Sequence, residues 1–369
     1  INLSVNKKVE IESKYPLVKL GEFTEIIAGQ SPESQYYNEN ENGLPFYQGK
    51  KDFGEIYLKS ANIWTSKTTK ESIYNDLLMS VRAPVGDVNL NPFEKICIGR
   101  GLAAIRTNEL KTQKYLFEFI HINKSIFKGN TGATFESIST SDLKNIKIPL
   151  PPLEIQEEIV KDCQKVDDEV SKANEIIEQS KQNIENGFLE LFSNATHSFK
   201  LSNDDIFDVS IGRRVLAKEI EENPSDEAIT VYSANVFEPF GYIKKDLLKD
   251  FSKDSVLWGI DGDWMVNFIP KEKPFYPTDH CGVVRIKQDV LHGRYLAWAL
   301  NKAGIEFRFS RANRASTERI KGMVIKAPSF EEQNKFALEV EKLEKNISEA
   351  QKVINGAKVK KEEILKKYL

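Results

Sequence analysis

The sequence has few cysteines, no long apolar run and no excess of positive charge. Its three cysteines, Cys97, Cys163 and Cys281, are odd in number and far apart, which favours free thiols in a reducing compartment over a disulfide framework. No stretch reaches about 18 apolar residues, so we expect no membrane span. No charged-then-apolar leader opens the chain, so we expect a cytoplasmic protein. The net charge of −3 does not indicate nucleic-acid binding, although charge segregated onto one face would permit it.

What the sequence does contain is a long internal repeat. The 369 residues, 40% of them hydrophobic, are enough for two ordinary domains. A proline stop with Pro151 is followed by Gln156 and about 40 residues of helical pattern, and the same element returns 177 residues later at Pro328 and Gln333. Seven apolar or small positions also match at this offset: Ile159/Phe336, Cys163/Val340, Val166/Leu343, Val170/Ile347, Ala173/Ala350, Ile177/Ile354 and Ser180/Ala357.

These matched positions step by four and three residues, which is the seam of a coiled coil. We expect the first helix to begin at Pro152 or Leu153, since proline suits the first helical turn. Ser329 with Glu332 forms a capping box at the start of the second helix. Two copies of one seam in one chain most simply bury each other antiparallel, with a globule at each end. Pairing mainly with another chain is the alternative.

A globular segment of mixed α/β pattern precedes each helix. In the first segment we expect strands at residues 44–47 and 77–82, a strand pair at 96–98 and 102–106, and an amphipathic helix at 114–127. Residues 256–263, 281–286 and 295–296 echo this order in the second segment. The offset drifts from 181 at the start of the cycle, where Leu201 echoes Leu20, to 177 at the helices. The globules are therefore divergent copies of each other.

This arrangement resembles the specificity subunit of type I restriction–modification systems, which has two target-recognition domains, each followed by a conserved helical region. The matching elements cover nearly the whole chain after residue 16, and Ile155 stands where the family usually has Glu. They are residues 18–22, 78–82, 132–138 and 146–156 in the first copy, and 199–201, 325–328 and 330–333 in the second.

The resemblance implies a fold and a division of the chain. The fold is mixed α/β, with two pseudo-repeated target-recognition domains separated by two long helices that pack as an antiparallel coiled coil. The segments are a lead-in (1–16), the first recognition domain (17–150), a central spacer helix (151–197), the second recognition domain (198–328) and a C-terminal spacer helix (329–369).

The resemblance also implies a function without catalysis. Each globule would read one half of a bipartite target in double-stranded DNA, and the helices would fix the gap between the halves. Methylation and restriction would be carried out by partners, namely two methyltransferase subunits and restriction subunits. The chain would hold no cofactor and no metal, and S-adenosylmethionine would bind the methyltransferase partner. The same double unit occurs in fused restriction–methylation polypeptides, so a detached region of such an enzyme is an alternative.

Phosphate contacts need Lys and Arg, and base reading favours Arg, Lys, Asn, Gln and hydroxyl groups. For each residue taken singly, a solvated surface position is the competing interpretation. As groups, the loops before the two helices (131–137 and 308–314) are better candidates, because they occupy equivalent places in the two copies. The candidate DNA-binding residues are Gln48, Lys50, Lys51, Arg82, Arg100, Thr131, Thr134, Arg213, Arg214, Ser233, Asn235, Arg308, Arg311, Asn313 and Arg314.

Two other function classes compete with a DNA reader. A nuclease would use scattered carboxylates such as Asp261, Asp263 and Asp279, but no motif singles them out, and Asp261-Gly262-Asp263 is more typical of a tight turn. A coiled-coil adaptor without DNA contact would suit the slightly acidic charge. DNA binding at low salt separates the adaptor from the reader, and metal-dependent cleavage by the chain alone would identify a nuclease.

Overall fold

The computed structural model describes residues 12–127, 137–248 and 250–369. The chain forms two compact units. The first unit comprises the residues up to Ala173 together with Lys352–Leu369, and the second comprises Asn174–Gln351. Both units therefore contain parts of the two long helices. The segment boundaries expected from the sequence, which give each helix a segment of its own, stay a prediction.

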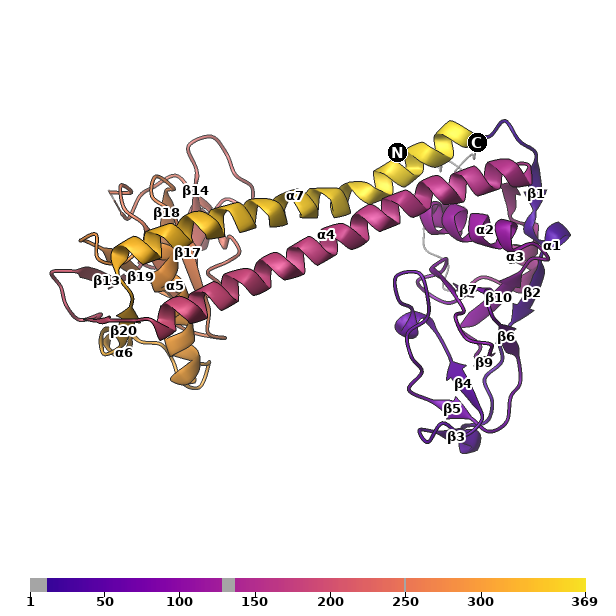
Figure 1. Cartoon of the computed structure of the whole chain (residues 1–369), viewed down its shortest axis with the longest axis horizontal. Coiled ribbons are helices and arrows are strands. Elements are labelled where there is room, and N and C mark those ends of the chain that lie inside the picture. Colours follow the sequence, from indigo (N-terminus) through magenta and orange to yellow (C-terminus); the bar gives the residue numbers. More distant parts are fainter. Residues whose placement is uncertain (1–11, 128–136, 249) are drawn as a thin grey trace. The chain divides into compact units, whose positions relative to one another are not determined.

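The first unit is built on an antiparallel four-stranded sheet in the order β2–β10–β7–β8. Its strands are β2 (Glu25–Ala28), β10 (Leu102–Arg106), β7 (Leu77–Ser80) and β8 (Val88–Leu90). The helix α2 (Leu110–Ile122) packs on this sheet and ends at the 3-10 turn η3 (Lys124–Phe127). Met79, Tyr115 and Phe119 are buried in the shared core, which also includes Ile159 and Cys163 of the long helix α4. Figure 1 shows α2 between this sheet and the first half of α4.

A second sheet of the first unit lies on the side of the four-stranded sheet away from α4 (Figure 1). Its order is β3–β5–β4–β9–β6, with β3 (Tyr37–Asn38), β5 (Trp64–Thr65), β4 (Leu44–Tyr47), β9 (Lys95–Ile98) and β6 (Glu71–Ile73). The short 3-10 turn η1 (Ser34–Tyr36) leads into β3, and the 3-10 turn η2 (Lys50–Asp52) lies between β4 and β5.

The prediction that the strands at 96–98 and 102–106 pair with each other is wrong. Both strands form, but β9 lies between β4 and β6 while β10 lies between β2 and β7. Each is a central strand whose two hydrogen-bonding edges are taken by other neighbours. The turn at Gly99–Gly101 redirects the chain from one sheet to the other, because Gly99 N donates to Tyr47 O (2.8 Å) and Leu102 N donates to Gly99 O (3.0 Å).

Short elements close the first unit. The strand β1 (Leu17–Lys19) pairs antiparallel with β11 (Lys147–Pro149), so Leu17 lies opposite Pro149. The helices α1 (Leu20–Phe23) and α3 (Thr140–Asn145) adjoin this ribbon. Ser139 caps α3 in a reciprocal capping box with Asp142.

The second unit repeats this plan. Its four-stranded sheet has the order β13–β19–β16–β17, with β13 (Phe207–Ile211), β19 (Cys281–Ile286), β16 (Ser255–Gly259) and β17 (Val266–Ile269). The smaller sheet β15–β14–β18 contains β15 (Gly241–Ile243), β14 (Ile229–Tyr232) and β18 (Phe275–Pro277). The closing ribbon pairs β12 (His197–Lys200) with β20 (Val324–Ala327). The helices are α5 (Gly293–Glu306), α6 (Thr317–Lys321) and the 3-10 turn η4 (Ala217–Glu219). The expected strands at 256–259 and 281–286 are confirmed.

The two long helices are α4 (Leu153–Ser193) and α7 (Phe330–Tyr368), and they pack antiparallel. In the first unit, Asp162 of α4 meets Tyr368 of α7 (Oδ2–Oη 2.9 Å) while Glu169 meets Lys360 (Oε2–Nζ 2.7 Å). Further along, in the second unit, the Phe188 and Phe336 ring centroids are 5.0 Å apart. The start of α4 at Leu153 agrees with the proline stop.

The seam predicted from the sequence is confirmed as an intramolecular one. All seven seam positions on α4 are buried, Ser180 among them at 4% exposure. The seven on α7 are buried or half-buried. Among the described residues, no helix combines the length and apolar composition that crossing a bilayer requires.

Candidate nucleic-acid interface

Three strand ends meet at one edge of the first unit. Besides the bond from Gly99 to Tyr47 O, Val81 N donates to Gly101 O (3.0 Å) and Ile138 N donates to Val81 O (3.0 Å). A side chain at Gly101 would place its Cβ 2.3 Å from Gln48 O, so the close approach of these backbones requires glycine. Gln48, Arg82 and Arg100 therefore project from three neighbouring chain segments. We call this place, with Lys50 and Lys51, the first edge.

The candidate residues of the first edge are exposed. Lys50 forms an ion pair with Asp87 (2.8 Å), and Lys124 approaches the same carboxylate (2.8 Å). Burial opposes ionisation of Asp87, but hydrogen bonds from Lys124 and Lys50 outweigh it and hold the pKa of this carboxyl below its usual value. The edge thus carries one neutralised carboxylate and a surplus of cationic groups. Thr131 and Thr134 lie outside the described residues.

The equivalent strand ends meet in the second unit, and we call that place the second edge. Thr278 N donates to Tyr232 O (2.9 Å), Ile260 N donates to His280 O (3.0 Å), and Arg213 N donates to Pro277 O (3.1 Å). These bonds bring the segments of Ser233, Asp261 and Arg213 together. Arg213 and Arg214 are exposed.

Three of the predicted contact residues shape the second edge. Asn235 Oδ1 accepts from Phe237 N (3.0 Å) and Glu238 N (3.2 Å), so the Asn235 side chain holds its own turn. Ser233 Oγ accepts from Thr278 Oγ1 (3.0 Å). Asn313 Nδ2 donates to Phe307 O (3.0 Å) and Arg308 O (3.1 Å). These side chains therefore have a structural role within the loops, whether or not they also reach a ligand.

The loop at 308–314 presents three arginines. Arg308, Arg311 and Arg314 are exposed, and Arg308 has a positive φ of 54°. Arg314 forms an ion pair with Asp261, whose carboxylate is also hydrogen-bonded to His280 Nδ1. Burial opposes ionisation of Asp261, yet the hydrogen bonds from His280 and Arg314 keep the pKa of this carboxyl below its usual value.

Sequence reasoning missed two contributors to the second edge. Asp261 was interpreted as part of a tight turn or as a scattered carboxylate of a nuclease, and not as the partner of an arginine. Gly262 does form the turn with a φ of +89°, and the link from Asp261 to Arg314 spans 53 residues. Arg319 was not selected, although its Nη1 donates to Arg314 O (2.8 Å) and its guanidinium lies 4.9 Å from the centroid of the Phe309 ring. No spacing signal in the sequence joins these residues.

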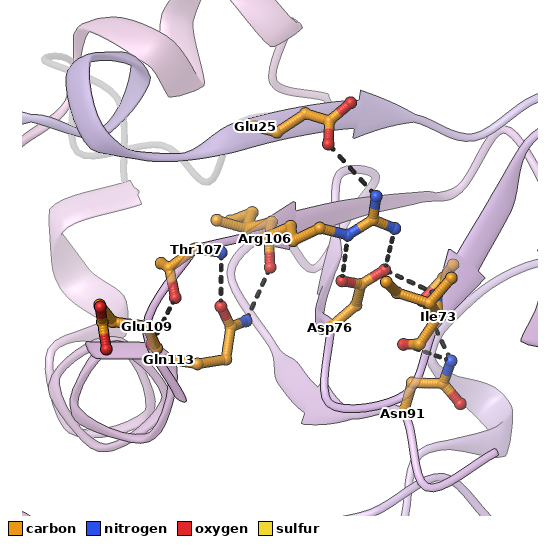
Figure 2. A network of polar contacts seen from close by, with 10 residues as sticks. Glu25, Ile73, Asp76, Asn91, Arg106, Thr107, Glu109 and Gln113 are labelled. Carbon is orange, nitrogen blue, oxygen red and sulfur yellow. Dashed lines mark hydrogen bonds and ion pairs between the residues drawn. The ribbon is translucent and has the colours of Figure 1, made fainter. Parts of the chain in front are cut away.

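Not every arginine of this fold is a candidate for DNA contact. Arg106 lies at the end of β10 that is far from the first edge, and its side chain is engaged within the protein (Figure 2). Its Nε and Nη2 donate to the two oxygens of Asp76 (both 2.8 Å), and its Nη1 donates to Glu25 (3.2 Å). Asp76 is 2% exposed. Arg106 therefore holds the sheet together. The described residues contain no group of three or more His, Cys, Asp or Glu side chains placed to bind a metal ion.

The glutamine of the proline stop has one structural role in both copies. Gln156 Nε2 donates to Pro151 O (2.7 Å), and Gln333 Nε2 donates to Pro328 O (3.0 Å). Both glutamines are buried. Each ties the first turn of a long helix to the proline that stands two residues before the helix begins. The repeat is thus conserved between the copies at the level of single hydrogen bonds.

Comparison with models of known protein families shows which family this chain belongs to. The model of the type I restriction modification DNA specificity domain matches residues 12–186 and again residues 199–358. The chain belongs to the type I restriction–modification DNA specificity family. The two matches contain the four-stranded sheets of the two units, and the family's specificity domain thus occurs twice in this chain. A solved structure of the type I restriction–modification S subunit of M. genitalium aligns over 98% of both chains, with a TM-score of 0.59 and 16% identity, and it supports the fold.

Two specificity subunits of Methanocaldococcus jannaschii are similar to parts of this chain. The one assigned to the type I restriction enzyme MjaX is 45% identical over 184 residues, which is 48% of this chain and 43% of that protein. The subunit of MjaVIII is 27% identical over 176 residues, 46% of this chain and 40% of that protein. The matched part is less than half the length of both relatives.

Proposed function

We propose that this chain is the DNA-recognition component of a type I restriction–modification complex and acts on DNA in the cytoplasm. Each edge reads one half of a bipartite target in double-stranded DNA. The observation that carries the proposal is the recurrence of one edge in both repeats, each with exposed arginines: Arg82 and Arg100 in the first edge, and Arg213 and Arg314 in the second. Membership of the DNA specificity family supports the same function.

The charge distribution suits this role better than the net charge suggests. Both edges expose Lys or Arg side chains, which could contact phosphate oxygens, while the long helix α4 carries far more acidic than basic side chains. Gln48 and the arginines have the donor geometry that reads base edges in the major groove. A slightly acidic chain can therefore present two local cationic surfaces.

The spacing between the half-sites is assigned to α4 and α7. Both helices are continuous over 41 and 39 residues, and their seam is buried, so they resist bending. Inserting one heptad into each helix at matching seam positions keeps the seam in register. We expect the insertion to change the gap between the half-sites and to leave both half-site sequences unchanged. An unchanged gap would show that the helices do not set the spacing.

Catalysis is assigned to partners. The chain itself is non-catalytic and holds no cofactor or metal, two methyltransferase subunits bring S-adenosylmethionine, and restriction subunits join the complex. Supporting this, the Asp261 carboxylate that a nuclease would need is already engaged by Arg314 and His280. Cleavage of DNA by the purified chain with Mg²⁺ would contradict the assignment.

The deciding experiment maps methylated bases genome-wide in cells that carry the full chain and its methyltransferase partner. The expected result is one methylated motif with two defined halves and a fixed gap, which disappears when the chain is deleted. A gel shift with the purified complex at low salt provides the direct check. Absence of both the motif and DNA binding would favour the adaptor without DNA contact.

A further inference from the structure

One position in each edge can be matched residue by residue through backbone hydrogen bonds. Val81 N donates to Gly101 O and Val81 O accepts from Ile138 N, both at 3.0 Å. In the second unit, Ile260 N donates to His280 O (3.0 Å) and Ile260 O accepts from Ala315 N (3.3 Å). Val81 and Ile260 are therefore equivalent.

The residues next to this matched point differ in charge. Arg82 corresponds to Asp261, and Ser137, which forms a β-bridge with Arg82, corresponds to Arg314. Each edge thus places one arginine at the same point of the fold. In the first unit this is Arg82, which follows the strand β7, and in the second it is Arg314, which belongs to the loop 308–314. In the second unit, the strand side supplies a carboxylate that binds this arginine.

We propose that Arg82 and Arg314 each read a guanine of their own half-site, and that Asp261 is the positioning residue that orients Arg314. This rests on the proposed function. Arg314 turns its Nε and Nη2 towards Asp261, which leaves Nη1 and the outer hydrogen of Nη2 to donate to guanine O6 and N7. Arg314 is 62% exposed while Asp261 is 22% exposed, so the carboxylate lies beneath the arginine and not on the surface that meets DNA.

A carboxylate facing phosphates would repel them unless it were neutralised. Asp261 is bracketed by Arg314 and His280, so its charge is compensated within the edge. Arg319 supports the loop from below through Arg314 O and Asn313. The alternative is that Asp261 and Arg314 only fasten the 308–314 loop to β16. A fastening role would act on stability and on all DNA sequences equally.

The test uses the full chain with its methyltransferase partner and duplexes in which each base pair of the mapped motif is varied in turn. We expect Arg314→Ala to reduce discrimination at one G·C pair of one half-site by about 5- to 150-fold and to leave the other positions unchanged. Arg314→Lys keeps the charge but lacks the fork, so it should lose the same discrimination with an unchanged salt dependence.

The positioning role is tested by Asp261→Asn, with Asp263→Asn as the matched control. We expect Asp261→Asn to weaken discrimination at the same base pair as Arg314→Ala, and Asp263→Asn to leave it intact. Arg82→Ala should relax one G·C pair of the other half-site. A cooperative thermal unfolding transition shows for each variant that it is folded. If Arg314→Ala does not fold, Arg314→Lys takes its place in the test.

Three results would count against the inference. A uniform loss of affinity in Arg314→Ala, with the salt slope reduced by about one, would identify a phosphate contact. Full discrimination in Asp261→Asn would show that the carboxylate does not orient the arginine. Failure of the wild-type complex to bind any duplex would overturn the proposed function and the inference with it, whereas the first two results overturn the inference alone.

Discussion

Replacement of Lys361 by methionine should destabilise the first unit strongly. Lys361 of α7 is buried between two carboxylates, Glu118 of α2 (Nζ–Oε2 2.9 Å) and Asp167 of α4 (2.8 Å). Burial disfavours its charge, but Glu118 and Asp167 outweigh burial and raise the pKa of Lys361 above its usual value. The lysine is therefore the cation that compensates the buried carboxylate of Glu118 and the half-buried carboxylate of Asp167.

Removing one partner of a buried ion pair costs about 3–5 kcal/mol, because the remaining charge loses its compensation. Against a typical total of about 5–15 kcal/mol, this is a large fraction of the stability of a domain. The neighbouring Lys360 offers a matched control, since its pair with Glu169 is about half exposed at both side chains. For Lys360→Met we expect less than about 1 kcal/mol.

Urea unfolding at neutral pH, followed by circular dichroism at 222 nm, measures the difference. The reasoning also predicts that Lys361→Met combined with Glu118→Gln is more stable than Lys361→Met alone, since one buried charge has been removed. Equal shifts for the Lys360 and Lys361 variants, or no recovery in the double variant, would refute the account of a buried charge cluster.

Two further predictions concern pH and packing. Burial, and to a lesser extent the charges of Lys124 and Lys361, lowers the pKa of His121 from 6.5 to about 4. The imidazole therefore binds a proton more tightly in the unfolded chain than in the folded one. Stability should therefore fall by up to about 3 kcal/mol as pH drops from about 6.5 towards 4, and His121→Gln should flatten this part of the pH profile of unfolding. A Cβ at Gly187 of α4 would lie 2.1 Å from the Phe336 ring, whereas Gly356 of α7 has nothing within 4 Å. Gly187→Ala should therefore lower the free energy of unfolding by about 1–3 kcal/mol through overpacking, and with it the melting temperature. Gly356→Ala should raise the free energy of unfolding by about 0.5–1 kcal/mol, because glycine is unfavourable inside a helix. Shifts of the same sign at both positions would contradict this account.

The features that could be predicted from the sequence are those with a periodic signal. The seam repeats every three or four residues, and the proline stop recurs with its glutamine, so both long helices and their pairing follow from pattern alone. The assignment of β9 and β10 to different sheets has no such signal. It depends on the Gly99–Gly101 turn and on strands far apart in the chain.

The candidate site was predictable only as a set of residue types. Arg82 and Arg314 were selected for their charge, but their equivalence depends on hydrogen bonds at Val81 and Ile260 that no alignment of residue types reveals. Asn235 and Asn313 were selected as contact residues, and their amides are engaged by the loop backbone. The partner of Arg314 lies 53 residues away at Asp261. Long-range pairing of this kind is decided by the fold.

The closing ribbons of the two units have a consequence for how such a chain can change over time. Because β1 pairs with β11, the chain enters and leaves the first globule at neighbouring points, and β12 with β20 does the same for the second. A genetic exchange with one breakpoint in each strand of the same ribbon would replace all the sheets and loops between the two strands. It would leave α4 and α7 intact. The incoming segment has to retain only the groups that meet the helices, such as the carboxylate of Glu118. New recognition surfaces can thus be acquired whole, in one recombination step, on an unchanged helical frame.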